Sequence, residues 1–288
     1  MIHKYAFTAA VCPTRRGPGE GIVYRGRVKI ALMDSGIGLL PAAAAVRRLR
    51  PDADLVLSWD PDGMPWGPRT PEDITERAIA VAEAAAAHEP DVLIVACNTA
   101  SVHSLPAMRA RFEPRLPIIG TVPAIKPAAA GGGPVAIWAT PATTGSAYQR
   151  GLIERFADGV AVAEVACPGL ADAVHHADDE AIDAAIASAA ARTPDDVTTL
   201  VLGCTNYELV AERIRAAVQR PGRPPLVLHG TAGAVAAQAL RRIGVEPAPE
   251  AAADTTLTVL LSGREATLPD TALSYDEGRF LRAVSPVR

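Results

Sequence analysis

The chain of 288 residues, 49% of them apolar, is long enough to form one large or two medium-sized domains with filled cores. Its net charge of -4 at pH 7 gives no basic surface for nucleic acid, and no apolar stretch reaches the length of a membrane span. The composition therefore predicts a soluble globular protein without nucleic-acid or membrane partners.

Four cysteines, Cys12, Cys97, Cys167 and Cys204, are spread over the chain. None has a second cysteine or a histidine at the spacing of a zinc site, and a core of this size does not need disulfides. Residues 1–27 contain neither the apolar region nor the cleavage site of a secretory signal, so we expect a flexible extension. The sequence predicts a cytoplasmic protein with reduced thiols and no metal.

Strand-like apolar runs alternate with alanine-rich helical runs from residue 28 onward, which is the rhythm of a mostly parallel sheet. A glycine-rich break at 131–133 precedes a second series of the same kind. The predicted strands are, in chain order, 28–33, 55–58, 92–96, 135–139, 161–165, 200–203, 226–228 and 257–261. The predicted helices are 41–49, 71–88, 146–156 and 232–242, with further helices up to residue 191.

The restart of this pattern after the glycines predicts an α/β fold made of two α/β halves. We place the first domain at 28–121 together with 229–288, because the last predicted strand is expected to pack back onto the first half. The second domain is placed at 122–228.

Cys97 and Cys204 end two near-equivalent segments, Asp-Val-Leu-Ile-Val-Ala-Cys-Asn-Thr at 91–99 and Thr-Thr-Leu-Val-Leu-Gly-Cys-Thr-Asn at 198–206. Each apolar run is typical of a buried parallel strand, and open α/β sheets bind ligands where such strands end. Pro106 indicates a short helix after Cys97 and a new helix at the proline. We expect both cysteines to lie near helix N-termini. Helix N-termini stabilise thiolates and bound carboxylates. Two thiols that face one substrate from opposite sides can move a proton between its mirror-image faces.

Further polar segments follow other predicted strands: Leu-Met-Asp-Ser-Gly at 32–36, Gly-Met-Pro-Trp-Gly at 63–67 and Ala-Thr-Pro-Ala-Thr at 139–143. Together with the two cysteine segments and Val-Pro-Ala-Ile-Lys-Pro at 122–127, they make the chain resemble the glutamate racemases, of the cofactor-independent aspartate/glutamate racemase superfamily. The likeness runs from about residue 28 to residue 244.

The resemblance implies two α/β domains related by a pseudo-twofold axis, with mostly parallel sheets and the active site in the cleft between them. It implies interconversion of L- and D-glutamate at Cα without pyridoxal phosphate, metal or any other cofactor. It also implies a cytoplasmic enzyme, usually a homodimer, that supplies D-glutamate for peptidoglycan and so for cell-wall biogenesis and cell shape. Some glutamate racemases inhibit DNA gyrase, and such an interaction is implied by analogy only.

By position, the resemblance makes Cys97 and Cys204 the catalytic thiols, with Asp34 assisting proton transfer beside Cys97. An unperturbed thiol, with a pKa of about 8.5, can act as acid or base after modest tuning. Asp34 is equally suited to cap the helix that follows it. The residues expected to bind the substrate are Ser35, Pro65, Trp66, Gly67, Asn98, Thr99, Thr140, Thr143, Thr205 and Asn206.

Three positions depart from the family pattern. Asn206 stands where the family has a histidine and cannot titrate, and Trp66 stands in place of a tyrosine and can only donate. His175 stands where relatives carry a glutamate that orients the histidine. One hypothesis is that His175 supplies the catalytic imidazole that Asn206 lacks. The other is that His175 and His176 are solvent-facing helix residues.

Two other functions stay open. The same pair of thiols could serve aspartate, another amino acid or a diacid, which the changes at Trp66 and Asn206 favour. Alternatively, the chain is a degenerate relative with little catalysis and a binding role, although such a protein has no need of opposed thiols.

Taken alone, a cysteine at the end of an apolar strand is more often a small buried hydrophobe than a nucleophile. We assign Cys167 to the core for this reason.

Overall fold

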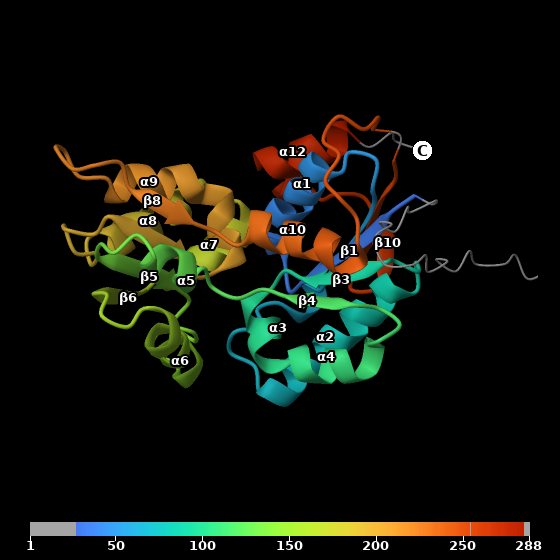
Figure 1. Ribbon diagram of the computed structural model, residues 1–288, viewed down its shortest axis with the longest axis horizontal. Coiled ribbons are helices and arrows are strands. Elements are labelled where there is room, and N and C mark those ends of the chain that lie inside the picture. Colours follow the sequence, from blue (N-terminus) through green and yellow to red (C-terminus); the bar gives the residue numbers. More distant parts are fainter. Residues whose placement is uncertain (1–26, 254, 285–288) are drawn as a thin grey trace, which may run out of the picture.

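The computed structural model describes residues 27–253 and 255–284, which form two α/β units side by side along the long axis (Figure 1). The predicted N-terminal extension, apart from Arg27, lies outside the described residues, and so does Cys12. Among the described residues, no helix has both the length and the apolar composition to cross a bilayer.

The first unit is built on a six-stranded sheet with the order β10-β9-β2-β1-β3-β4. Neighbouring strands are parallel, except that β10 runs antiparallel to β9. Its inner strands are almost completely buried, which explains why they are continuous hydrophobic runs in the sequence. The strands are β1 (Lys29–Asp34), β2 (Asp54–Trp59), β3 (Val92–Val95), β4 (Ile118–Gly120), β9 (Leu257–Leu261) and β10 (Arg264–Ala266).

Helices cover both faces of this sheet (Figure 1). One face carries α1 (Leu40–Leu49), α10 (Ala232–Ile243) and α12 (Asp276–Ala283), which follows the short α11 (Asp270–Leu273). The other face carries α2 (Pro71–Ala86), α3 (Asn98–His103) and α4 (Leu105–Phe112). The Thr70 hydroxyl accepts the Asp73 N–H at 3.3 Å and so begins α2.

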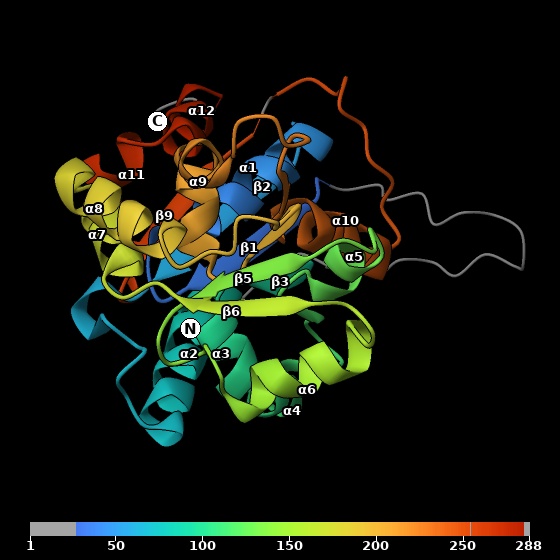
Figure 2. The ribbon, with the colours of Figure 1, turned by 90° about the vertical axis from the view of Figure 1, so that its left-hand side faces the viewer.

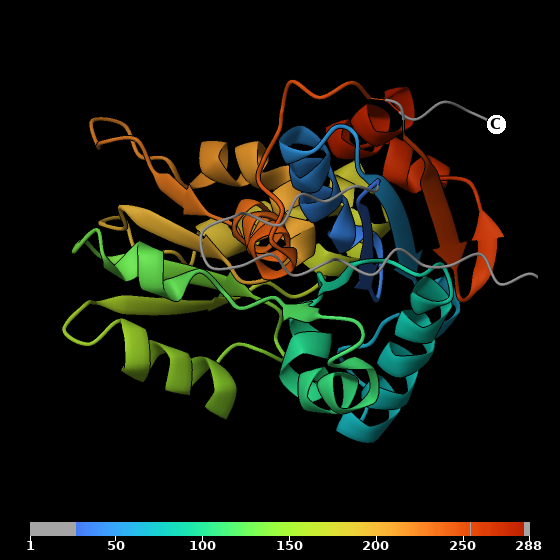
Figure 3. The same ribbon diagram turned by 45° about the vertical axis from the view of Figure 1, so that its right-hand side comes forward.

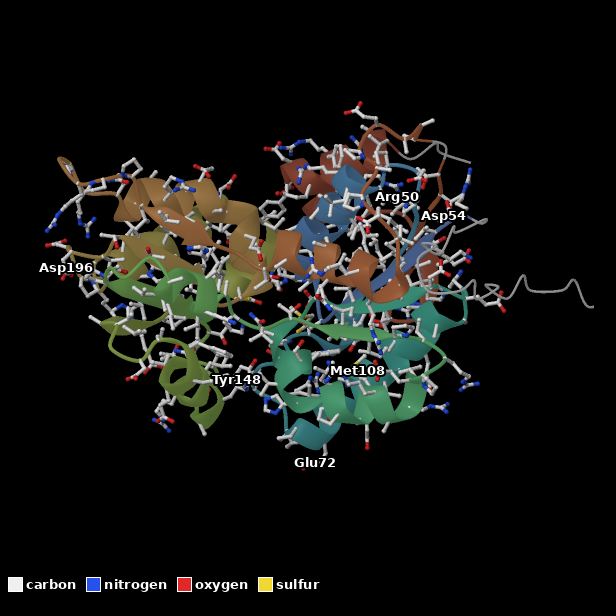
Figure 4. The ribbon with its side chains drawn as sticks, viewed as in Figure 1. Arg50, Asp54, Glu72, Met108, Tyr148 and Asp196 are labelled. Atoms are coloured by element: carbon white, nitrogen blue, oxygen red, sulfur yellow. The ribbon has the colours of Figure 1, made fainter. Side chains whose placement is uncertain are left out.

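The second unit contains a four-stranded parallel sheet with the order β6-β5-β7-β8. Figure 2 looks onto this unit, with β5 and β6 in front. In Figure 4, Tyr148 on α6 lies on the side nearest the first unit, and Asp196 lies at the far end. The elements are β5 (Val135–Ala139), β6 (Val162–Ala166), β7 (Thr199–Leu202), β8 (Val227–His229), α5 (Ile125–Ala129), α6 (Ala147–Phe156), α7 (Leu170–His176), α8 (Asp179–Ala190) and α9 (Ala211–Val218).

One apolar core runs through both units. Leu32 and Leu240 in the first unit belong to the same buried cluster as Leu200 and Ile186 in the second. The Tyr275 hydroxyl, just before α12, also donates to the carbonyl of Val174 on α7 at 2.6 Å. This shared core holds the two sheets against each other, because separating them would expose apolar surface to water.

The structure confirms the predicted α/β fold with two mostly parallel sheets, and each predicted strand is present. β9 pairs with β2, so the C-terminal strand returns to the first sheet. Short elements were missed: β4, β10, α5, α11 and α12. β8 ends at His229, one residue beyond residue 228, where we placed the end of the second domain. The domain boundaries themselves stay a prediction.

Candidate active site

A cavity of about 390 Å³ lies where strands of both sheets end. Its lining comes from the segments that follow β1, β2 and β3 in the first unit and β5, β6 and β7 in the second. The predicted site residues that line it are Asp34, Ser35, Pro65, Trp66, Gly67, Cys97, Asn98, Thr99, Thr140, Thr143, Cys204, Thr205 and Asn206.

Cys97 follows β3, and its side chain is 4% exposed. Its Sγ accepts the Ala100 N–H at 3.5 Å, which caps α3, and Ser35 Oγ lies 3.7 Å from Sγ. Burial, and then the nearby Asp34 carboxylate, raise the pKa of Cys97 well above its usual range. This thiol therefore keeps its proton at neutral pH.

Cys204 follows β7 and is half-buried. It precedes η3 (Thr205–Val210), a 3-10 helix that leads into α9, so a helix begins after each of the two cysteines as predicted. Burial raises the pKa of the Cys204 thiol to about 12. Both thiols are thus protonated before a ligand binds.

Asp34 ends β1, and its side chain is 2% exposed. Its Oδ1 accepts the Ser35 N–H at 2.6 Å, and its Oδ2 accepts the Thr205 hydroxyl at 3.2 Å. Burial raises the pKa of Asp34 to about 7, although hydrogen bonds from Cys97 and Ser35 favour the charged form. The helix-cap hypothesis is wrong: the 3-10 helix η1 (Ile37–Leu39) has Gly36 at its N-cap position and no side-chain cap.

Asn98 connects the two units at the cavity. Its Nδ2 donates to the carbonyl of Gly203, next to Cys204, at 2.7 Å. Its Oδ1 is buried and accepts no hydrogen bond from any described residue. This oxygen is a free acceptor on a residue that lines the cavity.

Two loops complete the lining. The loop after β2 holds η2 (Pro61–Gly63), and residues 64–68 that follow it all face the cavity. In the second unit, the turn after β5 contributes Thr140 and Thr143, whose hydroxyl oxygens are 3.2 Å apart.

His175 is the one predicted site residue that does not line the cavity. It is half-buried on α7, packed against Gly36, where an added Cβ would lie 2.7 Å from its Nδ1. That Nδ1 has no hydrogen-bond partner among the described residues. The Asn206 amide instead donates to the carbonyl of Ala171 at 2.8 Å. Of the two histidines in the solvent-facing hypothesis, His176 is exposed and His175 is half-buried. A catalytic role for His175 stays a prediction.

Sequence reasoning missed the wall contributed by the segment after β6. Cys167, Gly169, Ala171 and Asp172 all line the cavity. Cys167 is 1% exposed and belongs to the core as predicted, but it also borders the cavity. The segment follows a parallel strand, so the rule that ligands bind at strand ends would have found it.

Of the residues that the structure describes, two acidic ones, Asp34 and Asp172, line the cavity, and no lysine, arginine or histidine does. An anionic ligand group must therefore be held by hydroxyls and N–H groups, for which Ser35, Thr99 and Thr205 are suited. Within residues 27–253 and 255–284, side chains form no cluster with the make-up of a metal site.

The sequence is similar to those of several glutamate racemases. The enzyme of Roseiflexus sp. (strain RS-1) is 40% identical over 195 residues, which are 65% of this chain and 70% of the relative. The enzyme of Escherichia coli O139:H28 is 37% identical over 196 residues, which are 65% of this chain and 68% of the relative.

Solved structures share the fold. Escherichia coli glutamate racemase, in complex with L-glutamate and the activator UDP-MurNAc-ala, matches with a TM-score of 0.70 and 28% identity, over 90% of this chain and 96% of that one. Thermus thermophilus glutamate racemase, in complex with β-chloro-D-alanine, matches with a TM-score of 0.61 and 26% identity, over 82% of this chain and 88% of that one.

The family model described as Asp/Glu/hydantoin racemase matches residues 41–239, a range that contains both cysteine-bearing strand ends and most of the cavity lining. With the fold, the paired thiols and the relatives in agreement, the chain belongs to the Asp/Glu/hydantoin racemase family.

Proposed function

We propose that the protein is a cofactor-independent glutamate racemase that interconverts L- and D-glutamate by means of two thiols. The observation that carries the proposal is that Cys97 and Cys204 end corresponding strands of two sheets and line one cavity. The E. coli relative in complex with L-glutamate supports glutamate as the substrate.

Racemisation needs a base on one face of Cα and an acid on the other. One thiolate removes the Cα proton, the other thiol returns a proton to the opposite face, and the roles exchange with the direction of reaction. Because burial raises the pKa of both thiols, one of them must lose its proton before this step. We assign Asp34, whose pKa is about 7 and which is hydrogen-bonded to Cys97, to accept that proton.

Removal of the Cα proton sends negative charge into the substrate carboxylate. Hydrogen-bond donors aimed at this group lower the barrier because they stabilise charge that develops in the transition state. We assign this role to Ser35 and Thr99 and to the backbone N–H groups of Asn98 and Thr205, the residues that follow the two cysteines. Trp66, Thr140 and Thr143 then border the space for the substrate side chain.

The proposal is tested by circular dichroism of L- and D-glutamate with the wild type, Cys97→Ala and Cys204→Ala, with deuterium incorporation at Cα followed by NMR. We expect turnover in both directions with solvent deuterium in the product, and a loss of at least about a thousandfold in each cysteine variant. Cys12→Ala, outside the described residues, is the matched control. No turnover by the wild type, or full turnover by either variant, contradicts the proposal. L-aspartate in parallel tests the alternative substrate.

The cellular role is part of the same proposal. A cytoplasmic enzyme of this kind supplies D-glutamate for peptidoglycan, so the gene should restore growth of a bacterium that requires D-glutamate. We also propose a homodimer, which light scattering on the purified protein tests directly. An interaction with DNA gyrase stays a prediction of the resemblance alone.

A further inference from the structure

We propose that Asp60 is a positioning residue for the substrate, because it holds the Trp66 indole in the orientation that forms one wall of the cavity. This inference rests on the proposed function and concerns the same site. Asp60 itself is not among the residues that line the cavity.

Among the described residues, Asp60 is the one hydrogen-bond partner of the Trp66 side chain. The side chain is 2% exposed, and the indole Nε1 donates to Asp60 Oδ2 at 3.2 Å. An indole N–H can only donate, and a buried donor without an acceptor is unfavourable. A ring rotated away from Asp60 would lose this bond, so the bond selects one orientation.

Asp60 is fixed by donors from three parts of the chain. Its Oδ1 accepts the Gly63 N–H at 3.2 Å and the Ser262 hydroxyl at 2.8 Å, and its Oδ2 also accepts Arg77 on α2 at 3.1 Å. Asp60 as a whole residue is 6% exposed. Burial opposes its ionisation, but the hydrogen bonds from Ser262, Trp66 and Arg77 hold the pKa of Asp60 below its usual value. Asp60 therefore stays charged and acts as a fixed acceptor.

A chain of ion pairs connects the beginning of α2 to the loop after β2. Arg77 Nε donates to Asp73 Oδ1 at 3.0 Å, and Arg69 donates to Asp73 at 2.7 Å and to the Gly63 carbonyl at 2.8 Å. A side chain at position 63 would displace the Asp60 carboxylate and the Arg77 guanidinium, because an added Cβ would overlap both groups. Residues 64–68 have no helix or strand of their own, so this network sets their position.

Ser262 brings the C-terminal hairpin into the network. It lies in the turn between β9 and β10. These two strands form the outer edge of the first sheet (Figure 3). Its backbone has φ 45, a left-handed conformation that non-glycine residues seldom adopt. The strain is offset because the hydroxyl donates to Asp60 and accepts the Asp62 N–H at 3.2 Å. The β9–β10 edge of the sheet is thus hydrogen-bonded to the loop after β2, which lines the cavity.

A double-mutant cycle on glutamate turnover tests the proposal with Asp60→Asn, Trp66→Phe and the double variant. Phenylalanine keeps an aromatic wall but has no N–H. We expect Asp60→Asn to raise KM about tenfold with kcat changed less than about threefold, and to add less than about twofold to KM in the Trp66→Phe background. An equal effect of Asp60→Asn in both backgrounds overturns the proposal, because Asp60 would then act on the fold and not through Trp66.

Asp62→Asn is the matched control. Asp62 is an exposed carboxylate in the same loop, paired with Arg264 at 2.7 Å, and its loss should leave KM within about twofold of the wild type. A KM increase in this variant as large as that of Asp60→Asn overturns the proposal. The loss of any negative charge in the loop would then be enough to raise KM.

A measurement on the wild type covers the case in which Asp60→Asn does not fold. The Trp66 indole N–H signal, assigned by its loss in Trp66→Phe, should exchange with water at least about a hundredfold more slowly than an exposed indole. Exchange at the exposed rate overturns the proposed bond. This readout does not depend on turnover, so an inactive wild type with a protected indole contradicts the proposed function and not the Asp60–Trp66 bond.

Discussion

The side-chain amide of Asn98 donates to the carbonyl of Gly203 at 2.7 Å, so the residue after one cysteine is bonded to the residue before the other. Thr205, after the second cysteine, makes a similar bond to Asp34 in the first unit at 3.2 Å. Both bonds cross between the two sheets. They hold the two cysteine-bearing strand ends in fixed positions relative to each other. A reaction on both faces of one carbon requires this alignment.

Loss of the amide at position 98 should weaken this link. Asn98→Ala leaves the Gly203 carbonyl without its side-chain donor, and we expect the free energy of unfolding to fall by about 1–3 kcal/mol. We also expect kcat for glutamate to fall at least about tenfold, because the thiols lose their alignment. Urea unfolding and racemisation assays measure the two effects. A variant with wild-type kcat would show that alignment does not depend on this bond.

Asp34 should make the stability of the protein depend on pH. Its pKa is about 7 in the folded state, against about 3.9 in an unfolded chain. Between these values the folded state binds the extra proton, so the free energy of unfolding decreases as pH rises and levels off above pH 7. From pH 5 to pH 8, Asp34→Asn should gain roughly 1–3 kcal/mol relative to the wild type, measured by urea unfolding. A constant difference between the two proteins would argue against the raised pKa.

The free thiols should react slowly. Because burial keeps Cys97 and Cys204 protonated, alkylation by iodoacetamide at pH 8 is expected to be at least about tenfold slower than for free cysteine. Cys204 should react before Cys97, since it is the more exposed of the two. Mass spectrometry of the Cys12→Ala protein gives the order, and added glutamate should protect both thiols. Labelling at the rate of free cysteine contradicts the expected thiol state.

His175 should matter more for stability than for catalysis. Burial lowers its pKa, so the unfolded chain binds more protons just below pH 6.5, and stability rises with pH in that window. His175→Gln should remove this rise and leave kcat/KM within about threefold, because the ring does not line the cavity. Denaturant titrations from pH 5 to pH 7 and a pH–rate profile measure both. A loss above about tenfold with an altered profile would support the catalytic imidazole instead.

The strands and the two thiols were predictable because they depend on local patterns. A buried apolar run that ends on Cys97 or Cys204 is visible in a dozen residues, and parallel topology brings such ends together. The contact of Asp60 with Ser262 joins residues 202 positions apart, so no local pattern reveals it. The place of His175 was not predictable either, because the packing of α7 against Gly36 decides which way the ring points.

The pairing of β9 with β2 has a consequence for synthesis of the protein. The ribosome releases β5 to β8 as one continuous stretch, so the second sheet can form while translation continues. β2, an apolar strand, has no partner on one edge until residues 257–261 have emerged. Such an exposed edge promotes aggregation, so a nascent chain that stalls before β9 should need a chaperone. The loop that accepts the Ser262 hydrogen bond also gains its final shape only after β9 has emerged, so the candidate site is complete only from that point of synthesis onward.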